Sequence, residues 1–174
     1  DARATITRGE VFEFAEDVRA SDFNRDQIID FLGAAFAYPA GQSNQVMQIQ
    51  AFLRNKGNAA KLLTALRGLQ HETDPVAAYA AVVGTGLPAK FASALVYFLG
   101  GAQGGGQNEA AIICSNRARV AGLPASEGAD PAWPAEAYRD YLARLGEARD
   151  AYNPELGLDA VEFAARKFAA AQTD

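Results

Sequence analysis

Residues 82–99 read VVGTGLPAKFASALVYFL, and this stretch decides the fold that the sequence predicts. A glycine-containing turn separates two apolar segments, and Gly86 suits a tight turn because it carries no Cβ. Pro88 suits the start of the following helix, where its missing N–H leaves no hydrogen bond unmade. The helix after the turn contains small residues that allow another helix to approach closely: Ala92, Ser93 and Ala94. This order of elements predicts a helix–hairpin–helix at about residues 76–99.

The rest of the chain also predicts helices, because hydrophobic residues recur at helical spacing and no segment alternates as a strand does. Expected helix starts are Thr7, Asn24, Ser43, Asn58, Asp74, Lys90, Ala135 and Asp159, and a further helix is expected to end near Gly122. Capping-box pairs are expected for Thr7 with Glu10, Asn24 with Gln27, and Asp159 with Glu162. The sequence therefore predicts an all-α fold of about nine helices in two helical lobes. We expect one domain over residues 1–174, with the hairpin at the floor of the cleft between the lobes.

Composition limits the class of protein. Of 174 residues, 49% are hydrophobic and 21% are charged, which is enough apolar material for a core and too little charge for a disordered chain. No apolar run reaches the roughly 18 residues of a membrane span, and no secretory signal precedes the first helix. One Cys and one His exclude an internal disulfide and the usual zinc cage. We therefore expect a cytoplasmic protein with no metal, no cofactor and no membrane partner.

The net charge of −5 argues against a general nucleic-acid coat protein, which would be basic. It does not exclude a local basic face, because the cations gather in two places. These are Arg54 with Lys56 and Lys61, and Arg117 with Arg119. The acidic total predicts a shallow salt dependence of DNA binding, from roughly two to four phosphate contacts at about 0.9 each.

Several residues that attract attention have ordinary interpretations. His71 is the single histidine and stands in a predicted inter-helix turn, where a surface or capping role is expected. Trp133 lies between two prolines and is expected to anchor a loop on the helices. The aromatic residues Phe91, Tyr97 and Phe98 recur at helical spacing, which is typical of core positions.

Two segments carry a resemblance to a known family. Residues 86–92 read GLPAKFA, and residues 112–120 read IICSNRARV. They resemble the helix–hairpin–helix DNA glycosylases, the superfamily of endonuclease III and 8-oxoguanine glycosylase. The first segment follows the family turn G-V-G-x-K-x-A, with Pro88 in place of the second glycine. The second follows I-L-D-x-N-x-x-R-V, with Cys114 at the position of the catalytic aspartate.

The resemblance extends more loosely over residues 20–170 to a bacterial group described as 8-oxoguanine glycosylase-like, and no Cys cluster suggests an iron–sulfur site. It implies that the base flips out of duplex DNA and that the Lys90 amine then attacks the sugar C1′. The family aspartate stabilises the positive charge on the sugar, which the neutral thiol of Cys114 cannot do. Asn116 takes the place of the acid only if the alignment shifts by two residues. The DNA-binding residues implied are Gly84, Gly86, Leu87, Ala89, Arg117 and Arg119.

Two functions remain open from the sequence. The first is a DNA glycosylase that recognises a damaged or modified base and cleaves its N-glycosidic bond through Lys90, with activity reduced or lost through Cys114. The alternative is a non-catalytic helix–hairpin–helix module that binds DNA or a protein partner. Without the resemblance, Lys90 is a solvated residue of a first helical turn, and Cys114 is a small buried hydrophobic residue.

Overall fold

The structure of the chain, a computed structural model, describes residues 6–38, 43–101, 108–113 and 133–171. These residues form eight helices and no strand, so the predicted all-α class is confirmed. The helices are α1 (Arg8–Ala20), α2 (Arg25–Ala37), α3 (Ser43–Arg54), α4 (Lys56–Arg67), α5 (Pro75–Val83), α6 (Ala89–Gly101), α7 (Ala135–Tyr152) and α8 (Leu158–Ala171). The helix expected to end near Gly122 lies outside the described residues.

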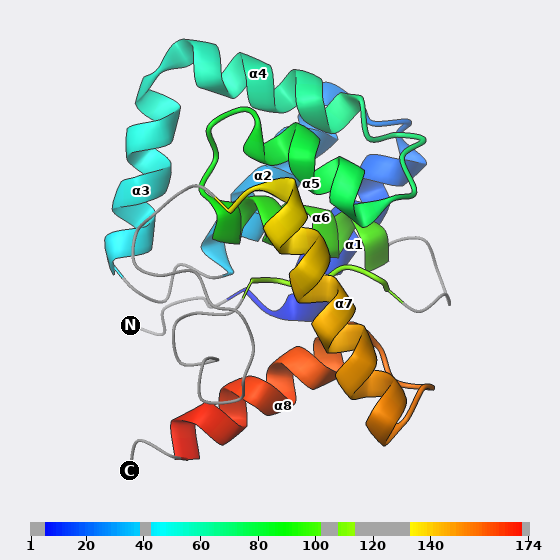
Figure 1. Cartoon of the computed structure of the whole chain (residues 1–174). Coiled ribbons are helices and arrows are strands. Elements are labelled where there is room, and N and C mark those ends of the chain that lie inside the picture. Colours follow the sequence, from blue (N-terminus) through cyan, green and yellow to red (C-terminus); the bar gives the residue numbers. More distant parts are fainter. Residues whose placement is uncertain (1–5, 39–42, 102–107, 114–132, 172–174) are drawn as a thin grey trace.

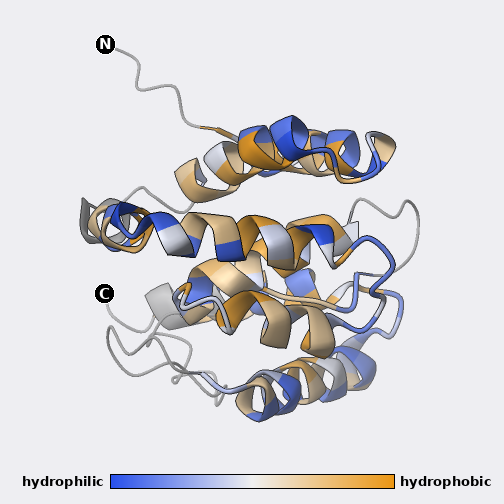
Figure 2. Ribbon diagram, turned by 90° about the horizontal axis from the view of Figure 1, so that it is seen from above, coloured by the Kyte–Doolittle hydropathy of each residue, from blue (hydrophilic) through white to orange (hydrophobic). Residues whose placement is uncertain are grey.

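Helix α6 lies at the centre of the molecule, where it contacts α1, α2 and α5 (Figure 1). Every residue from Phe91 to Leu99 is buried, including the three aromatic residues that the sequence assigns to the core. In Figure 1, α7 crosses in front of α5 and α6, and α1 and α2 lie behind them. Hydrophobic residues accordingly concentrate in the middle layers of the molecule (Figure 2). A helix covered on all sides has no need of a polar face.

Local signals set most helix starts as predicted. Thr7 and Glu10 form a complete capping box. The Asn24 side chain caps α2 by accepting from the Asp26 N–H, but the expected box with Gln27 is wrong, because the Asn24 N–H donates to the Ser21 hydroxyl. Asp74 caps α5 by accepting from the Val76 N–H, with Pro75 in the first turn. Helix α7 has the bounds expected from the sequence.

Two expected helix starts are wrong. Helix α4 begins at Lys56, before the expected Asn58, because the Asn55 side chain accepts from the Gly57 N–H and caps the helix earlier. Helix α8 begins at Leu158, so Asp159 stands inside its first turn and is not its cap. The Asp159 carboxylate instead accepts from the Tyr97 hydroxyl at 2.8 Å, a tertiary contact that spacing along the chain cannot reveal.

Helices α3 and α4 pack on each other at one end of the molecule, and α4 joins this pair to α2 and α5. The hairpin expected at about residues 76–99 falls on α5, the turn after it, and α6, and the two helices pack together. Among the described residues, no helix is both long and apolar enough to cross a membrane.

Candidate functional site

The turn between α5 and α6 spans residues 84–88, and its exposed residues are Gly84 and Gly86. Gly84 follows the last residue of α5 and is exposed, whereas the Leu87 side chain is fully buried beneath the turn. The Pro88 carbonyl accepts the first hydrogen bonds of α6. Within the described residues, no hydrogen bond engages the backbone N–H of Leu87 or Ala89. Both residues are buried, at 0% and 3% exposure, so the surface of the turn is formed by Gly84 and Gly86.

Gly86 holds the turn in a conformation that other residues rarely adopt. Its φ is 93°, in the left-handed region where a Cβ clashes with the following carbonyl. A Cβ added there would lie 3.8 Å from Cε2 of Phe52, which is ordinary contact. The backbone, and not the available space, therefore requires glycine at this position. Phe52 also shows that α3 lies against the turn.

Lys90 stands in the first turn of α6 at the molecular surface. Of residues 89–99 it alone is not buried, and its side chain is half-buried. The Lys90 carbonyl accepts a hydrogen bond of 2.9 Å from the Ser93 hydroxyl. The same hydroxyl oxygen accepts a bond of 2.9 Å from the Ile113 N–H. Ser93 thus ties the first turn of α6 to the end of a distant segment.

That segment, residues 108–113, runs without regular secondary structure between α6 and α7. Ala110, Ala111 and Ile113 are buried, so their backbone groups need partners other than water. Side chains supply them. Tyr138 donates from its hydroxyl to the Ala111 carbonyl at 2.9 Å and accepts from the Ala111 N–H at 3.4 Å. The Tyr141 hydroxyl donates to the Ile112 carbonyl at 2.7 Å, and Asn108 accepts from the Ala110 N–H at 3.0 Å.

These bonds hold the chain up to Ile113, the residue that precedes Cys114. Of the expected site residues, the structure describes the turn residues and Lys90. The other four lie outside the described residues: Cys114, Asn116, Arg117 and Arg119. Sequence reasoning missed Ser93, Tyr138 and Tyr141. Ser93 was expected only to allow close helix packing, and the two tyrosines resemble any apolar positions of an amphipathic helix.

A described carboxylate that replaced the missing aspartate would have to lie near Lys90. Asp159 borders a hollow of about 510 Å³, but it accepts from the Tyr97 hydroxyl and pairs with Arg8 at 3.6 Å. Burial and this bond to Asp159 raise the pKa of Tyr97 well above its usual value. Tyr97 is seven residues along α6 from Lys90, about 10 Å at the rise of an α-helix. Asp159 therefore serves the packing of α8 and does not face Lys90.

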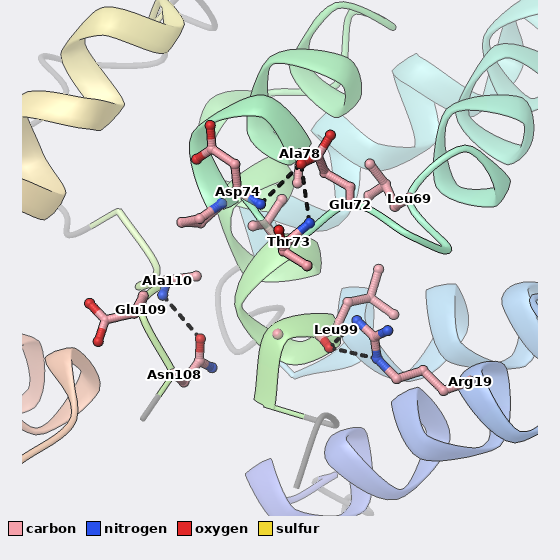
Figure 3. Close-up of a pocket in the computed structure, with 13 residues that line it drawn as sticks. Arg19, Leu69, Glu72, Thr73, Asp74, Ala78, Leu99, Asn108, Glu109 and Ala110 are labelled. Atoms are coloured by element: carbon pink, nitrogen blue, oxygen red, sulfur yellow. Dashed lines mark hydrogen bonds between the residues drawn. The ribbon is translucent and has the colours of Figure 1, made fainter. Parts of the chain in front are cut away.

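The hollow in Figure 3, about 140 Å³ in volume, lies at the opposite end of α6 from Lys90. Arg19 donates from Nε and Nη2 to the Leu99 carbonyl at 3.0 and 2.8 Å. Glu72 accepts from the backbone N–H groups of Thr73 and Asp74. The polar side chains in this hollow thus form hydrogen bonds with backbone groups just before α5 and at the end of α6, and we assign the hollow a structural role.

The remaining candidates behave as expected. His71 is exposed in the turn after α4. Trp133 packs edge-on against Tyr141, and its carbonyl accepts from the Tyr79 hydroxyl at 2.8 Å. The described part of the chain contains no group of His, Cys, Asp and Glu residues that could hold a metal ion.

Comparison with known families gives a match over most of the chain. A family model described as "Putative 8-oxoguanine DNA glycosylase OGG-like protein" matches residues 1–165. Curated proteins give no significant match, and solved structures give none either.

Proposed function

Because this chain belongs to the OGG-like 8-oxoguanine DNA glycosylase family, we propose that it binds duplex DNA through the α5–α6 turn and acts on a damaged or modified base there. The exposed turn at Gly84 and Gly86, together with Arg117 and Arg119, contacts phosphates of the DNA backbone in this proposal. The turn positions Gly84 and Gly86 keep side chains away from the approaching strand.

In the proposed reaction, Lys90 is the nucleophile and the target base leaves the duplex before chemistry begins. The neutral amine attacks C1′ of the sugar, the bond from C1′ to the base breaks, and the base departs with a proton. The nucleophile needs a partner that stabilises positive charge on the sugar. Cys114 is the residue that resemblance assigns to that place, and its thiol is neutral. We therefore expect slow cleavage by the natural sequence.

The observation that carries this proposal is the hydrogen-bonded link through Ser93. Its hydroxyl oxygen bonds both the Lys90 carbonyl and the Ile113 N–H. This link anchors Ile113. Cys114 is the next residue, and consecutive Cα atoms are about 3.8 Å apart. The link supports a site that combines Lys90 with Cys114.

Borohydride trapping on duplexes that contain 8-oxoguanine tests the proposal. A lysine nucleophile forms a Schiff base that borohydride reduces to a covalent protein–DNA adduct. We expect a small amount of adduct from the natural sequence and none from Lys90→Gln. Adduct that persists in Lys90→Gln would exclude Lys90 as the nucleophile.

The second candidate function, binding without cleavage, is favoured by the same Cys114. It predicts that the chain binds duplex DNA but yields no adduct with any lesion, even when an aspartate is restored. Absence of duplex binding at low salt would exclude both functions.

A further inference from the structure

The corner where α3 meets α4 carries three cations that the proposed function does not use. Arg54 ends α3, Lys56 begins α4, and Lys61 lies farther along α4. All three residues are exposed. We call these residues the cationic corner.

The chain segregates its charge around this corner. Residues 31–71 contain no Asp or Glu, although they contain four of the sixteen Lys and Arg residues. The rest of the chain holds all 21 carboxylates and the other twelve cations. A locally positive surface therefore exists in a chain whose net charge is −5.

Among the described residues, the cations of the corner have no ion-pair partner. No carboxylate among the described residues lies within ion-pair distance of Arg54, Lys56 or Lys61. In contrast, Arg8 pairs with Asp159, and Arg149 pairs with Glu109 at 3.2 Å. Exposed cations without an internal partner remain available to an external anion.

The cationic corner lies beside the α5–α6 turn (Figure 1). Phe52, two residues before Arg54, lies against Gly86. Lys61 and Thr64 of α4 line one side of an open groove, and Gly84 and Thr85 line the other. The hairpin adds no opposing charge, because residues 75–108 contain no Asp or Glu. The turn and the corner thus form one continuous surface.

We propose that the cationic corner is a second contact for duplex DNA, in which Arg54, Lys56 and Lys61 bind the phosphate backbone next to the stretch held by the turn. This inference rests on the proposed function, since it extends the same bound duplex onto a neighbouring face. Phosphate contacts fix register and raise affinity without reading sequence. The corner therefore contributes equally to intact and lesion-containing duplexes.

The test measures binding of a fluorescein-labelled duplex by anisotropy over a range of salt concentrations. The variant R54Q/K56Q/K61Q removes the three positive charges of the cationic corner. The charge-matched control R25Q/R139Q/R144Q removes three exposed cations from α2 and α7. Lys90→Glu probes the turn separately. We expect the corner variant to bind at least about tenfold more weakly and its salt slope to fall by about 2.7, from about 0.9 for each lost contact.

The outcomes separate the two proposals. If the corner variant binds like the charge-matched control while Lys90→Glu weakens binding, the proposal of a second DNA contact is overturned and the proposed function stands. If the natural sequence does not bind duplex DNA at low salt, both are overturned. Should the triple variant melt early, the single variants R54Q, K56Q and K61Q replace it, each expected to lower the slope by about 0.9.

Discussion

The two ends of α6 are completed in opposite ways. At the C-terminal end, Arg19 donates twice to the Leu99 carbonyl, and Asn108 donates to the Tyr97 carbonyl at 2.8 Å. At the N-terminal end, Pro88 offers no side-chain acceptor, and no described group accepts from the Ala89 N–H. Side chains of the protein cap the C-terminal end of α6, and no described side chain caps its N-terminal end.

This difference follows the electrostatics of a helix. The negative C-terminal end attracts cations such as the Arg19 guanidinium, and the positive N-terminal end attracts anions. An internal carboxylate at the start of α6 would satisfy that end but would also repel a phosphate. We therefore expect substitutions at the C-terminal end of α6 to alter stability, and substitutions at its N-terminal end to alter binding and chemistry.

The largest expected effect is at the N-terminal end. Cys114→Asp restores the family's charge partner for the sugar, so the rate of adduct formation should rise by about a hundredfold. Borohydride trapping measures this gain, and adding Lys90→Gln should abolish it. If Cys114 is ordinary core, the buried carboxylate should destabilise the fold instead. A large fall in Tm with no gain in adduct would contradict the shared site.

The second effect tests the link between Lys90 and the segment before Cys114. Ser93→Ala should lower the free energy of unfolding by about 1–3 kcal/mol, because the buried Ile113 N–H loses its acceptor. Ser21→Ala is the matched control, since the Ser21 hydroxyl also makes two backbone bonds but is only partly buried. Urea unfolding measures both variants, and an equal loss in the two would contradict a special role for Ser93.

The third effect concerns the turn. Gly86→Ala should cost about 1–2 kcal/mol, because a Cβ is strained at a φ of 93°. The same substitution at Gly146, inside α7 with open space around a Cβ, should stabilise by about 0.5–1 kcal/mol. Thermal melts should therefore show shifts of opposite sign. A shift of the same sign in both variants would contradict the strained turn.

The fourth effect is at the C-terminal end. Arg19→Met keeps much of the apolar stem but removes both donors to the Leu99 carbonyl, which should cost about 1 kcal/mol for a charged bond that is partly exposed to water. Duplex binding should not change, because Leu99 is nine residues, about 13 Å, from Lys90 along α6. Arg144→Met removes an exposed cation of α7 as the control. A loss of duplex binding in Arg19→Met but not in Arg144→Met would contradict the expectation that the C-terminal end of α6 affects stability alone.

How well the sequence predicts each part depends on the range of the interaction. Thr7, Asn24 and Asp74 cap their helices through residues two or three positions away, so short patterns predict these starts. Asp159 shows the same pattern, yet its carboxylate bonds Tyr97, 62 residues distant. A cap signal fails where a tertiary partner takes the side chain.

Prediction of the candidate site from the sequence has the same limit. The sequence predicts the turn and the position of Lys90 after it because their spacing is local. Tyr138 and Tyr141 bond carbonyl groups 27 and 29 residues away, and their hydroxyls lie on a helix whose pattern indicates only an apolar face. Their partners, Ala111 and Ile112, belong to an irregular segment with no periodic signal. These hydrogen bonds become predictable only when the packing of α7 against α5 is known.

The smallest effect comes from the start of α1, which the protein completes itself, unlike the start of α6. The backbone N–H and the hydroxyl of Thr7 donate to the Glu10 carboxylate and lower its pKa. A carboxyl whose pKa is lower in the folded state stabilises the fold above its unfolded pKa, and this contribution disappears as the pH falls through the folded pKa. Glu10→Gln should therefore lower Tm slightly at pH 7 and leave it unchanged at about pH 2, well below the ordinary glutamate pKa. Glu13→Gln, an exposed position three residues beyond Glu10 on α1, is the control. A gap between Glu10→Gln and the natural sequence that persists at low pH would mean that shape, and not charge, completes this helix start.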